Sequence, residues 1–297
     1  MSLVLSAGVI ATVNKYEAFF YLRGDVSVGI NGILPGWSNC PGSCSTSDAT
    51  GFDVQLVNFL AEKYNFSPVF KPLTPDRREQ ALVDGEVDLV VANFSMDGTS
   101  SDDSTKKRRE VVNFAGPYFL DQSGVMYSEA KLEQYYAKDK KFAQEHPNGN
   151  VFPPDEICLS KGTTASVYMD GQGQILSQAD CFDRFGKRDD SIIGAITDET
   201  ILRAYSKARY PDMAAGPVVW EGESSAIHKE KYGVGTRKDD SRLCRLLAQG
   251  IEEFLSDPDN TGPDRSRWQM AFDTELADSD DSSTEHRPEK VDSSYCE

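Results

Sequence analysis

Hydrophobic residues recur along this chain at two spacings that predict different kinds of secondary structure. Short apolar runs predict strands over residues 9–13, 67–72, 87–94, 125–127, 156–160, 191–197, 218–220 and 232–236. Apolar residues at helical spacing predict amphipathic helices over residues 52–64, 77–84, 131–145, 198–207 and 243–255, with a short last helix around Trp268. Strands and helices alternate along the chain, and this order is typical of an α/β fold.

Three stretches have the composition of loops. Residues 31–50 are rich in Gly, Pro, Ser and Cys, residues 97–104 are polar and acidic, and the tail from Glu275 onward is charged. We expect the tail to be disordered unless Cys296 ties it down. The chain of 297 residues exceeds one ordinary compact domain and suits two lobes of about 100–150 residues each.

The charge of the chain argues against two classes of partner. Acidic residues outnumber basic ones, and the net charge is −17 at pH 7. A surface this acidic repels nucleic acids and anionic lipids. No apolar run reaches the length of about 18 residues that a membrane-spanning helix needs. The opening Met1-Ser2-Leu3 lacks the basic residues of a signal peptide, so we expect the export segment to be absent from this sequence.

The six cysteines fit disulfides in an oxidising compartment better than a metal or redox site. Three histidines are present and none lies near a cysteine pair, which argues against zinc, and we expect neither a metal nor a cofactor. The short Cys40–Cys44 spacing differs from that of a redox motif. Six cysteines allow about 15 pairings. Chain order favours Cys40–Cys44, Cys158–Cys181 and Cys244–Cys296.

The chain contains, in separate segments, the groups that a free α-amino acid requires of a binding site. The ligand carboxylate needs an arginine fork and backbone N–H groups, and the ligand ammonium needs a carboxylate. The stretch from Thr105 to Tyr118 has Thr105 three residues before Arg108, and then an Asn113-Phe114 step and Pro117-Tyr118. This pattern resembles the signature of the family 3 extracellular solute-binding proteins, the polar amino-acid receptors of ABC importers. The resemblance implies that Arg108 binds the ligand carboxylate, whereas a solvated basic helix face is the alternative.

The resemblance extends over most of the chain. The segment Gly51-Phe52-Asp53-Val54-Gln55-Leu56 looks like the motif that opens the first helix of the family, and Asp84-Gly85-Glu86-Val87-Asp88-Leu89 looks like its helix-to-strand turn. The following strand implies ligand contacts from Asn93 and Ser95. The loop Lys161-Gly162-Thr163-Thr164 implies a helix cap whose Thr163 and Thr164 meet the carboxylate, and the step Thr197-Asp198-Glu199 implies that Asp198 pairs with the ligand ammonium.

Weaker assignments concern the side chain of the ligand. By resemblance Tyr16 packs on it, a task that Phe19 or Phe20 can share, and Arg78 selects an acidic or polar group. Each assignment has a structural alternative: an aromatic residue in the core, a surface arginine, or an ordinary helix cap at Thr164 or Asp198. The loop over residues 96–104 and the insertion over residues 131–154 depart from the family pattern and leave the identity of the ligand open.

The resemblance implies two α/β lobes joined by a two-strand hinge, the type II periplasmic binding protein fold. Lobe 1 then comprises residues 1–121 and 220–297, and lobe 2 comprises residues 122–219. We expect an extracytoplasmic monomer, free or lipid-anchored, that closes around a glutamate-like L-amino acid and serves an ABC permease. Two alternatives remain. One is an extracellular sensor domain, and the other is an enzyme on the same fold, such as a dehydratase or lyase. For an enzyme, Glu199 is the local candidate acid or base, because His146, His228 and His286 lie in predicted loops or in the tail.

Overall fold

The structure, a computed structural model, describes residues 22–45, 48–100, 106–147, 152–168, 173–187, 191–209, 214–217, 229–256, 266–277 and 283–297. The chain divides into two compact units. Unit 1 comprises Met1–Leu73, Arg77–Leu120 and Lys231–Glu297, and unit 2 comprises Thr74–Asp76 and Asp121–Glu230. Among the described residues, no helix is long and apolar enough to cross a membrane.

Unit 1 is built on a mixed sheet with the strand order β4-β1-β5-β11-β6. β1 pairs in parallel with β4 on one side and with β5 on the other, while β11 is antiparallel to β5. A separate antiparallel pair, β2 with β3, lies in the predicted loop over residues 31–50. The strands are β1 Asp25–Ile30, β2 Ile33–Leu34, β3 Ser38–Asn39, β4 Ser67–Pro72, β5 Leu89–Val90, β6 Val112–Tyr127 and β11 Lys229–Arg237.

The helices of unit 1 begin and end where the sequence provides the required backbone conformations. α2 follows Gly51, whose φ of 118° is accessible to glycine, and a Cβ there would lie 2.4 Å from the carbonyl oxygen of Trp37. α2 ends at Asn65, which adopts the left-handed conformation that favours asparagine and glycine. The α-helices are α2 Phe52–Tyr64, α3 Arg78–Val83, α9 Ser241–Leu255, α10 Arg267–Glu275 and α11 Ser283–His286, and three-residue or four-residue 3-10 turns cover Pro75–Arg77, Arg108–Glu110 and Ser293–Cys296.

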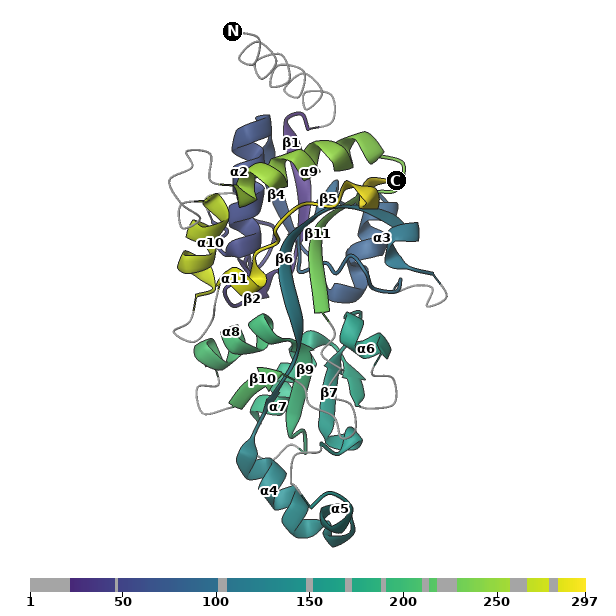
Figure 1. Cartoon of the computed structure of the whole chain (residues 1–297), viewed down its shortest axis with the longest axis vertical. Coiled ribbons are helices and arrows are strands. Elements are labelled where there is room, and N and C mark those ends of the chain that lie inside the picture. Colours follow the sequence, from purple (N-terminus) through teal and green to yellow (C-terminus); the bar gives the residue numbers. More distant parts are fainter. Residues whose placement is uncertain are drawn as a thin grey trace. The chain divides into compact units, whose positions relative to one another are not determined.

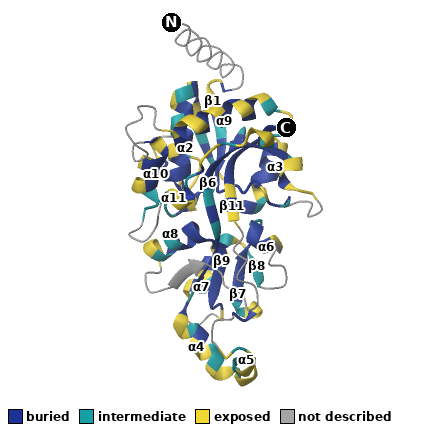
Figure 2. Ribbon diagram, in the orientation of Figure 1, coloured by how far each residue is buried: buried dark blue, intermediate teal, exposed yellow. Residues whose placement is uncertain are grey.

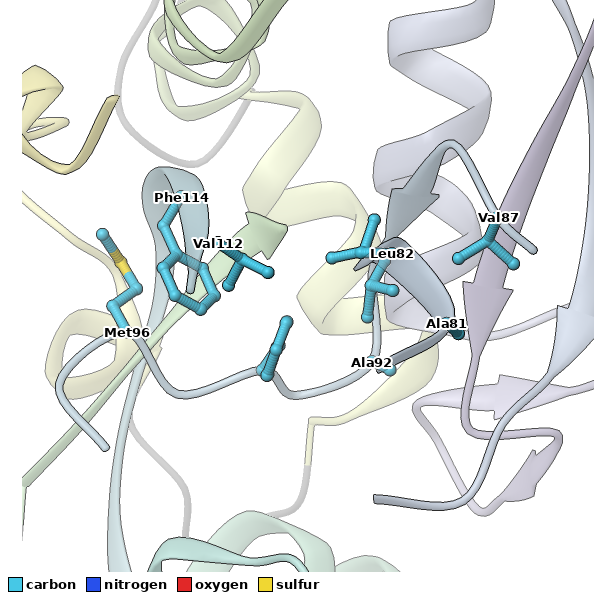
Figure 3. Packing of buried hydrophobic residues seen from close by; sticks show 9 residues of the cluster. Ala81, Leu82, Val87, Ala92, Met96, Val112 and Phe114 are labelled. Atoms are coloured by element: carbon cyan, nitrogen blue, oxygen red, sulfur yellow. The ribbon is translucent and has the colours of Figure 1, made fainter. Parts of the chain in front are cut away.

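Buried side chains from α3, from β5 and the segments on either side of it, and from β6 form one of the cores of unit 1, which Figure 3 shows from close by. Its members are Ala81, Leu82, Val87, Val90, Ala92, Phe94, Met96, Val112 and Phe114. Phe94 and Phe114 meet edge to face with ring centroids 4.8 Å apart. This packing fixes the chain segment that follows β5, and that segment carries two of the predicted site residues, Asn93 and Ser95.

Unit 2 has its own sheet. The second half of β6 pairs antiparallel with β9 and with β10, and β7 lies parallel to both β9 and β8. Figure 1 shows how β6 continues from the strands of unit 1 into this sheet. The elements are β7 Ile157–Ser160, β8 Gln174–Leu176, β9 Gly194–Asp198, β10 Ala214–Pro217, α4 Glu129–Lys138, α5 Lys140–Glu145, α6 Thr164–Tyr168, α7 Gln178–Gly186, α8 Glu199–Arg209 and the 3-10 turn Pro154–Glu156.

The three disulfides join the pairs that chain order predicts. Cys40 pairs with Cys44, Cys158 with Cys181, and Cys244 with Cys296. The last of them ties the C-terminal segment to α9. Residues 283–297 are therefore structured, and His286 is buried against the rings of Phe119 and Phe272. Cys296 thus ties the tail down, which is the condition under which we expect the tail to be ordered, and His286 lies in this tail at the end of the short helix α11.

Three predicted elements differ markedly from the structure. The strand expected over residues 87–94 is limited to Leu89–Val90, because Asn93 turns the chain with a φ of 47°. The strand expected over residues 125–127 is only the end of β6, which has 16 residues and changes its pairing partners along its length. The helix expected over residues 131–145 is two helices, since Asp139 ends α4 and caps α5 with its side chain. Figure 2 shows α4 and α5 as largely exposed. The runs over residues 9–13 and 218–220 lie outside the described residues.

Candidate functional site

The Arg108 side chain is held by a buried ion pair within unit 1. Its Nε lies 2.9 Å from Oε1 of Glu79, and both side chains are 2% exposed. Nη1 donates to the backbone oxygen of Ser95 over 2.7 Å. Within the described residues, Nη2 has no hydrogen-bond partner. The neighbouring Arg109 is exposed.

The faces of the Arg108 guanidinium are also in contact with unit 1. The Cζ atom lies 5.0 Å from the centroid of the Phe94 ring, a distance typical of a cation–π contact. Gly98 approaches so closely that a Cβ at this position would lie 2.8 Å from Nη1. The guanidinium is therefore fixed in one pose by Glu79, Ser95, Phe94 and Gly98.

The predicted loop over residues 96–104 closes at its base as a small hairpin. The backbone N–H of Arg108 donates to the oxygen of Gly98 over 2.8 Å, and that of Ser100 donates to Lys106 over 2.9 Å. The Ser100 hydroxyl donates to Oε2 of Glu79 over 2.6 Å. Glu79 thus joins the hairpin base to Arg108. Residues 101–105, which include Thr105 of the predicted signature, lie outside the described residues.

Arg78 is buried and supports the backbone beside the predicted contact residues. Its Nη1 donates to the carbonyl oxygens of Ala92, over 2.6 Å, and of Asn93, over 3.0 Å. Its Cζ lies 5.2 Å from the Phe94 ring centroid. Phe94 is therefore in contact with both arginines that the sequence singled out. The selection of the ligand side chain by Arg78 stays a prediction.

Asn93 and Ser95 are both buried in unit 1. Asn93 adopts a left-handed conformation, and its Oδ1 accepts from Nδ2 of Asn31 over 2.6 Å. Its own Nδ2 is buried and, within the described residues, has no hydrogen-bond partner. Ser95 pairs with Tyr232 of β11 through a single bridge. The structure thus brings Arg108, Ser95, Asn93 and Arg78 together around Phe94.

The buried pair of Asp53 and Tyr118 is a feature that the sequence analysis missed. The Tyr118 hydroxyl donates to Oδ1 of Asp53 over 2.8 Å. Burial raises the pKa of Asp53 to about 7, although the hydrogen bonds from Tyr118 and the Asn93 backbone and the charge of Arg78 oppose the shift. Burial also raises the pKa of Tyr118 well above its ordinary value. The available signal was an acidic residue among the apolar positions of the predicted helix over residues 52–64.

The unit 2 candidates lie beyond the carboxyl ends of two neighbouring parallel strands. β7 leads into Thr163 and Thr164, and β9 ends at Asp198. The two strands pair in parallel, so these ends meet at one edge of the sheet, where ligands of α/β sheets bind. Asp198 and Thr164 are buried, and the Thr164 hydroxyl lies 3.5 Å from Oε2 of Glu230. The Thr163 hydroxyl donates to the oxygen of Ser160 over 2.7 Å, as in an ordinary helix-entry turn.

Glu199, the candidate acid or base of the enzyme alternative, is engaged in unit 2. Its Oε1 accepts from Arg203, with Nη2 at 2.6 Å and Nε at 3.0 Å. Its Oε2 lies 2.5 Å from Nε2 of Gln122. Both oxygens are thus hydrogen-bonded to side chains of the unit.

Several candidates lie outside the described residues: Tyr16, Phe19, Phe20 and His228. Among the residues that the structure does describe, no group of three or more His, Cys, Asp or Glu could hold a metal ion.

Comparison with known proteins finds a matching family, similar sequences and similar solved structures. Residues 41–260 match the bacterial extracellular solute-binding proteins, family 3. Glutamate-binding protein GluB of Corynebacterium efficiens is 24% identical over 248 residues, which cover 79% of this chain and 76% of that protein. The L-cysteine solute receptor of Neisseria gonorrhoeae aligns with a TM-score of 0.66 at 18% identity, over 94% of this chain and 99% of the receptor. The ancestral amino acid-binding protein AncCDT-1, a precursor of cyclohexadienyl dehydratase, aligns with a TM-score of 0.63 at 18% identity, over 89% of this chain and 99% of that protein.

The two α/β units and the strand that continues from one into the other define the class: this is the fold of the type II periplasmic binding proteins. The family match spans about three quarters of the sequence. The chain belongs to the bacterial extracellular solute-binding proteins, family 3, and is an extracytoplasmic protein.

Proposed function

We propose that this protein is the substrate-binding component of an amino-acid ABC importer and that its ligand is a polar L-amino acid. Family membership supports the role in solute binding. A relative that binds glutamate and a structural neighbour that receives L-cysteine support an amino acid as the ligand.

The observation that carries the proposal is the fixed Arg108 guanidinium. A ligand carboxylate binds best to a planar donor that is already oriented, because the cost of ordering the side chain has been met before binding. Arg108 is oriented by Glu79 and the oxygen of Ser95, and its Nη2 has no partner within the described residues. In this proposal Arg108 binds the α-carboxylate of the ligand, together with the loop at Thr163 and Thr164.

Asp198 then binds the α-ammonium group. It is buried at the end of β9 in unit 2, whereas Arg108 belongs to unit 1. The proposal therefore requires the ligand to draw on both units, and binding would stabilise the closed conformation that a permease recognises. Asn93, Ser95, Arg78 and Tyr16 complete the proposed ligand contacts, and a glutamate-like side chain is the leading candidate.

In the proposal the protein acts as a monomer that delivers its ligand to a membrane permease without transforming it. The engagement of both Glu199 oxygens by Arg203 and Gln122 argues against a free catalytic carboxylate at that position. The precursor of a dehydratase among the structural neighbours makes this worth testing directly. Incubation with each bound ligand followed by mass spectrometry should return the ligand unchanged. Membrane fractionation of producing cells distinguishes a lipid anchor from free secretion.

A thermal-shift screen against the common amino acids tests the proposal. A ligand at about 100 times its dissociation constant should add about 2.7 kcal/mol of stability. Calorimetry on Asp198→Asn should then show binding weakened by about 2–5 kcal/mol, because the ammonium loses its counter-charge. Arg109→Ala, at the exposed neighbour of Arg108, is the matched control and should bind normally. The proposal is wrong if no amino acid shifts the melting temperature, or if Asp198→Asn binds as well as the parent protein.

A further inference from the structure

Glu79 gives the proposed carboxylate-binding residue a counter-charge within the protein itself. We propose that Glu79 sets the affinity of the protein for the ligand carboxylate, because it already neutralises Arg108 and the ligand binds as a second, competing acceptor. This inference rests on the proposed function, since it takes Arg108 to be a ligand contact. It assigns a specificity-determining role to a residue that does not itself need to touch the ligand.

Glu79 accepts a hydrogen bond from one nitrogen, Nε, of the Arg108 guanidinium. Oε1 of Glu79 accepts from Nε over 2.9 Å, and the Ser95 oxygen accepts from Nη1 over 2.7 Å. The end of the fork at Nη2 has no partner within the described residues. A ligand carboxylate that binds at Nη2 would therefore not have to displace Glu79, and two carboxylates would then share one guanidinium.

Because Arg108 and Glu79 are buried, the charge of Glu79 strongly affects any second carboxylate at Arg108. Both side chains are 2% exposed, so water screens their charges poorly. The positive charge of Arg108 is largely compensated before any ligand arrives, and Glu79 repels an approaching carboxylate. The pair also protects the empty protein, because a buried arginine without a counter-charge is strongly destabilising.

Replacing Glu79 with glutamine removes the negative charge of this side chain and leaves the position of Arg108 unchanged. The glutamine oxygen can still accept from Nε of Arg108. The Ser100 hydroxyl, which now donates to Oε2, can turn and accept from the new amide instead. The pose of Arg108 is thus retained while the competing charge is removed. We expect Glu79→Gln to bind a carboxylate ligand on the order of tenfold more tightly. We also expect it to melt at a lower temperature than the parent protein when no ligand is present.

Gly98→Ala should change the affinity for the ligand in the opposite direction to Glu79→Gln. The added Cβ would lie 2.8 Å from Nη1 and 3.0 Å from Cζ of Arg108, so the guanidinium must move while its charge and its partner Glu79 remain. We expect this variant to bind the same ligand on the order of tenfold more weakly. Gly42→Ala is the matched control, because a Cβ there meets nothing within 4 Å. Glu86→Gln, at an exposed ion pair with Arg77, is the control for the loss of one acidic charge.

The experiment is calorimetric titration of the parent protein and these variants with the amino acid found by the screen and with its α-amide, which lacks the carboxylate. Tighter binding of the amino acid by Glu79→Gln, with little change for the α-amide, supports the inference. If Glu79→Gln binds the amino acid equally well or more weakly, Glu79 has only a structural role and the inference is overturned. That result leaves amino-acid binding by the parent protein intact, whereas failure of the proposed function would appear as no binding by the parent protein at all.

Discussion

The hydroxyl of Tyr118 lies 2.8 Å from Oδ1 of Asp53, and both side chains are completely buried in unit 1. The first turn of α2 supplies the aspartate and β6 supplies the tyrosine. The bond therefore joins the start of a helix to the strand that continues into unit 2. Because the aspartate is removed from water, its protonation is coupled to folding.

The pH dependence of stability should reveal this coupling. The folded-state pKa of Asp53, about 7, is above the ordinary value of 3.8, so the folded protein holds a proton that the unfolded chain has released. The resulting stabilisation is complete below pH 3.8 and is lost as the pH rises to about 7. Asp53→Asn keeps an acceptor for Tyr118 but cannot titrate. Its stability relative to the parent protein should therefore improve from pH 4 to pH 7, by at most about 1.4 kcal/mol per pH unit.

Urea unfolding at several pH values between 4 and 7 measures this difference. Asp84→Asn, at an exposed position after α3, is the control for the loss of one acidic side chain. Parallel stability curves for Asp53→Asn and the parent protein would show that Asp53 titrates normally in the folded state.

A double-mutant cycle on Arg108 and Glu79 should measure how much the ion pair contributes to the stability of the fold. Arg108→Met leaves a buried carboxylate without its partner and should cost about 3–5 kcal/mol of unfolding free energy. Adding Glu79→Leu removes that carboxylate as well, so the double variant should recover most of the loss. Denaturant unfolding of the four proteins gives the coupling energy. Additive losses would mean that the pair contributes no mutual stabilisation.

The disulfide between Cys244 and Cys296 should be the most stabilising of the three in the chain-entropy description. It closes a segment with a sequence separation of 52 residues. Replacing both cysteines with alanine should cost about 4 kcal/mol, against about 2 kcal/mol for the short loop of Cys40 and Cys44. Thermal unfolding of the two double-alanine variants compares them. Equal losses would show that local packing, rather than loop closure, governs both effects.

His286 should contribute to stability although it lies near the end of the chain. Its ring stacks on Phe119 with centroids 5.1 Å apart, and Nδ1 lies 2.8 Å from the oxygen of Leu120, to which it donates in the corresponding tautomer. His286→Ala should cost about 2–3 kcal/mol, because the stacking and the buried hydrogen bond are both lost.

His146→Ala is the matched control for this change. His146 ends α5, a helix with no buried residue, and its loss should change stability by less than about 0.5 kcal/mol. Chemical denaturation compares the two variants, and a similar small effect for both would contradict the assigned role of His286.

Much of the local structure could be predicted from the sequence. The helix over residues 52–64 and the strand over residues 67–72 have the predicted bounds, because their apolar spacing is regular and Gly51 and Asn65 delimit the helix. The strand over residues 87–94 was overestimated, because the left-handed turn at Asn93 depends on packing and hydrogen bonds that no local pattern encodes. The length of β6 could not be predicted from local pattern either, because its pairing partners come from distant parts of the chain.

The candidate site, too, was predicted from the sequence in part and decided by the tertiary structure in part. The resemblance to the family 3 solute-binding proteins singled out Arg108, Arg78, Asn93 and Ser95, and the structure brings these four residues together around Phe94. The sequence by itself determined the alternation of strands and helices and the motif that carries Arg108, because propensity and spacing are local properties. Only the tertiary structure decided that Glu79 neutralises Arg108 and that Asp53 is buried beside Tyr118, because burial and pairing depend on residues brought together from separate segments of the chain.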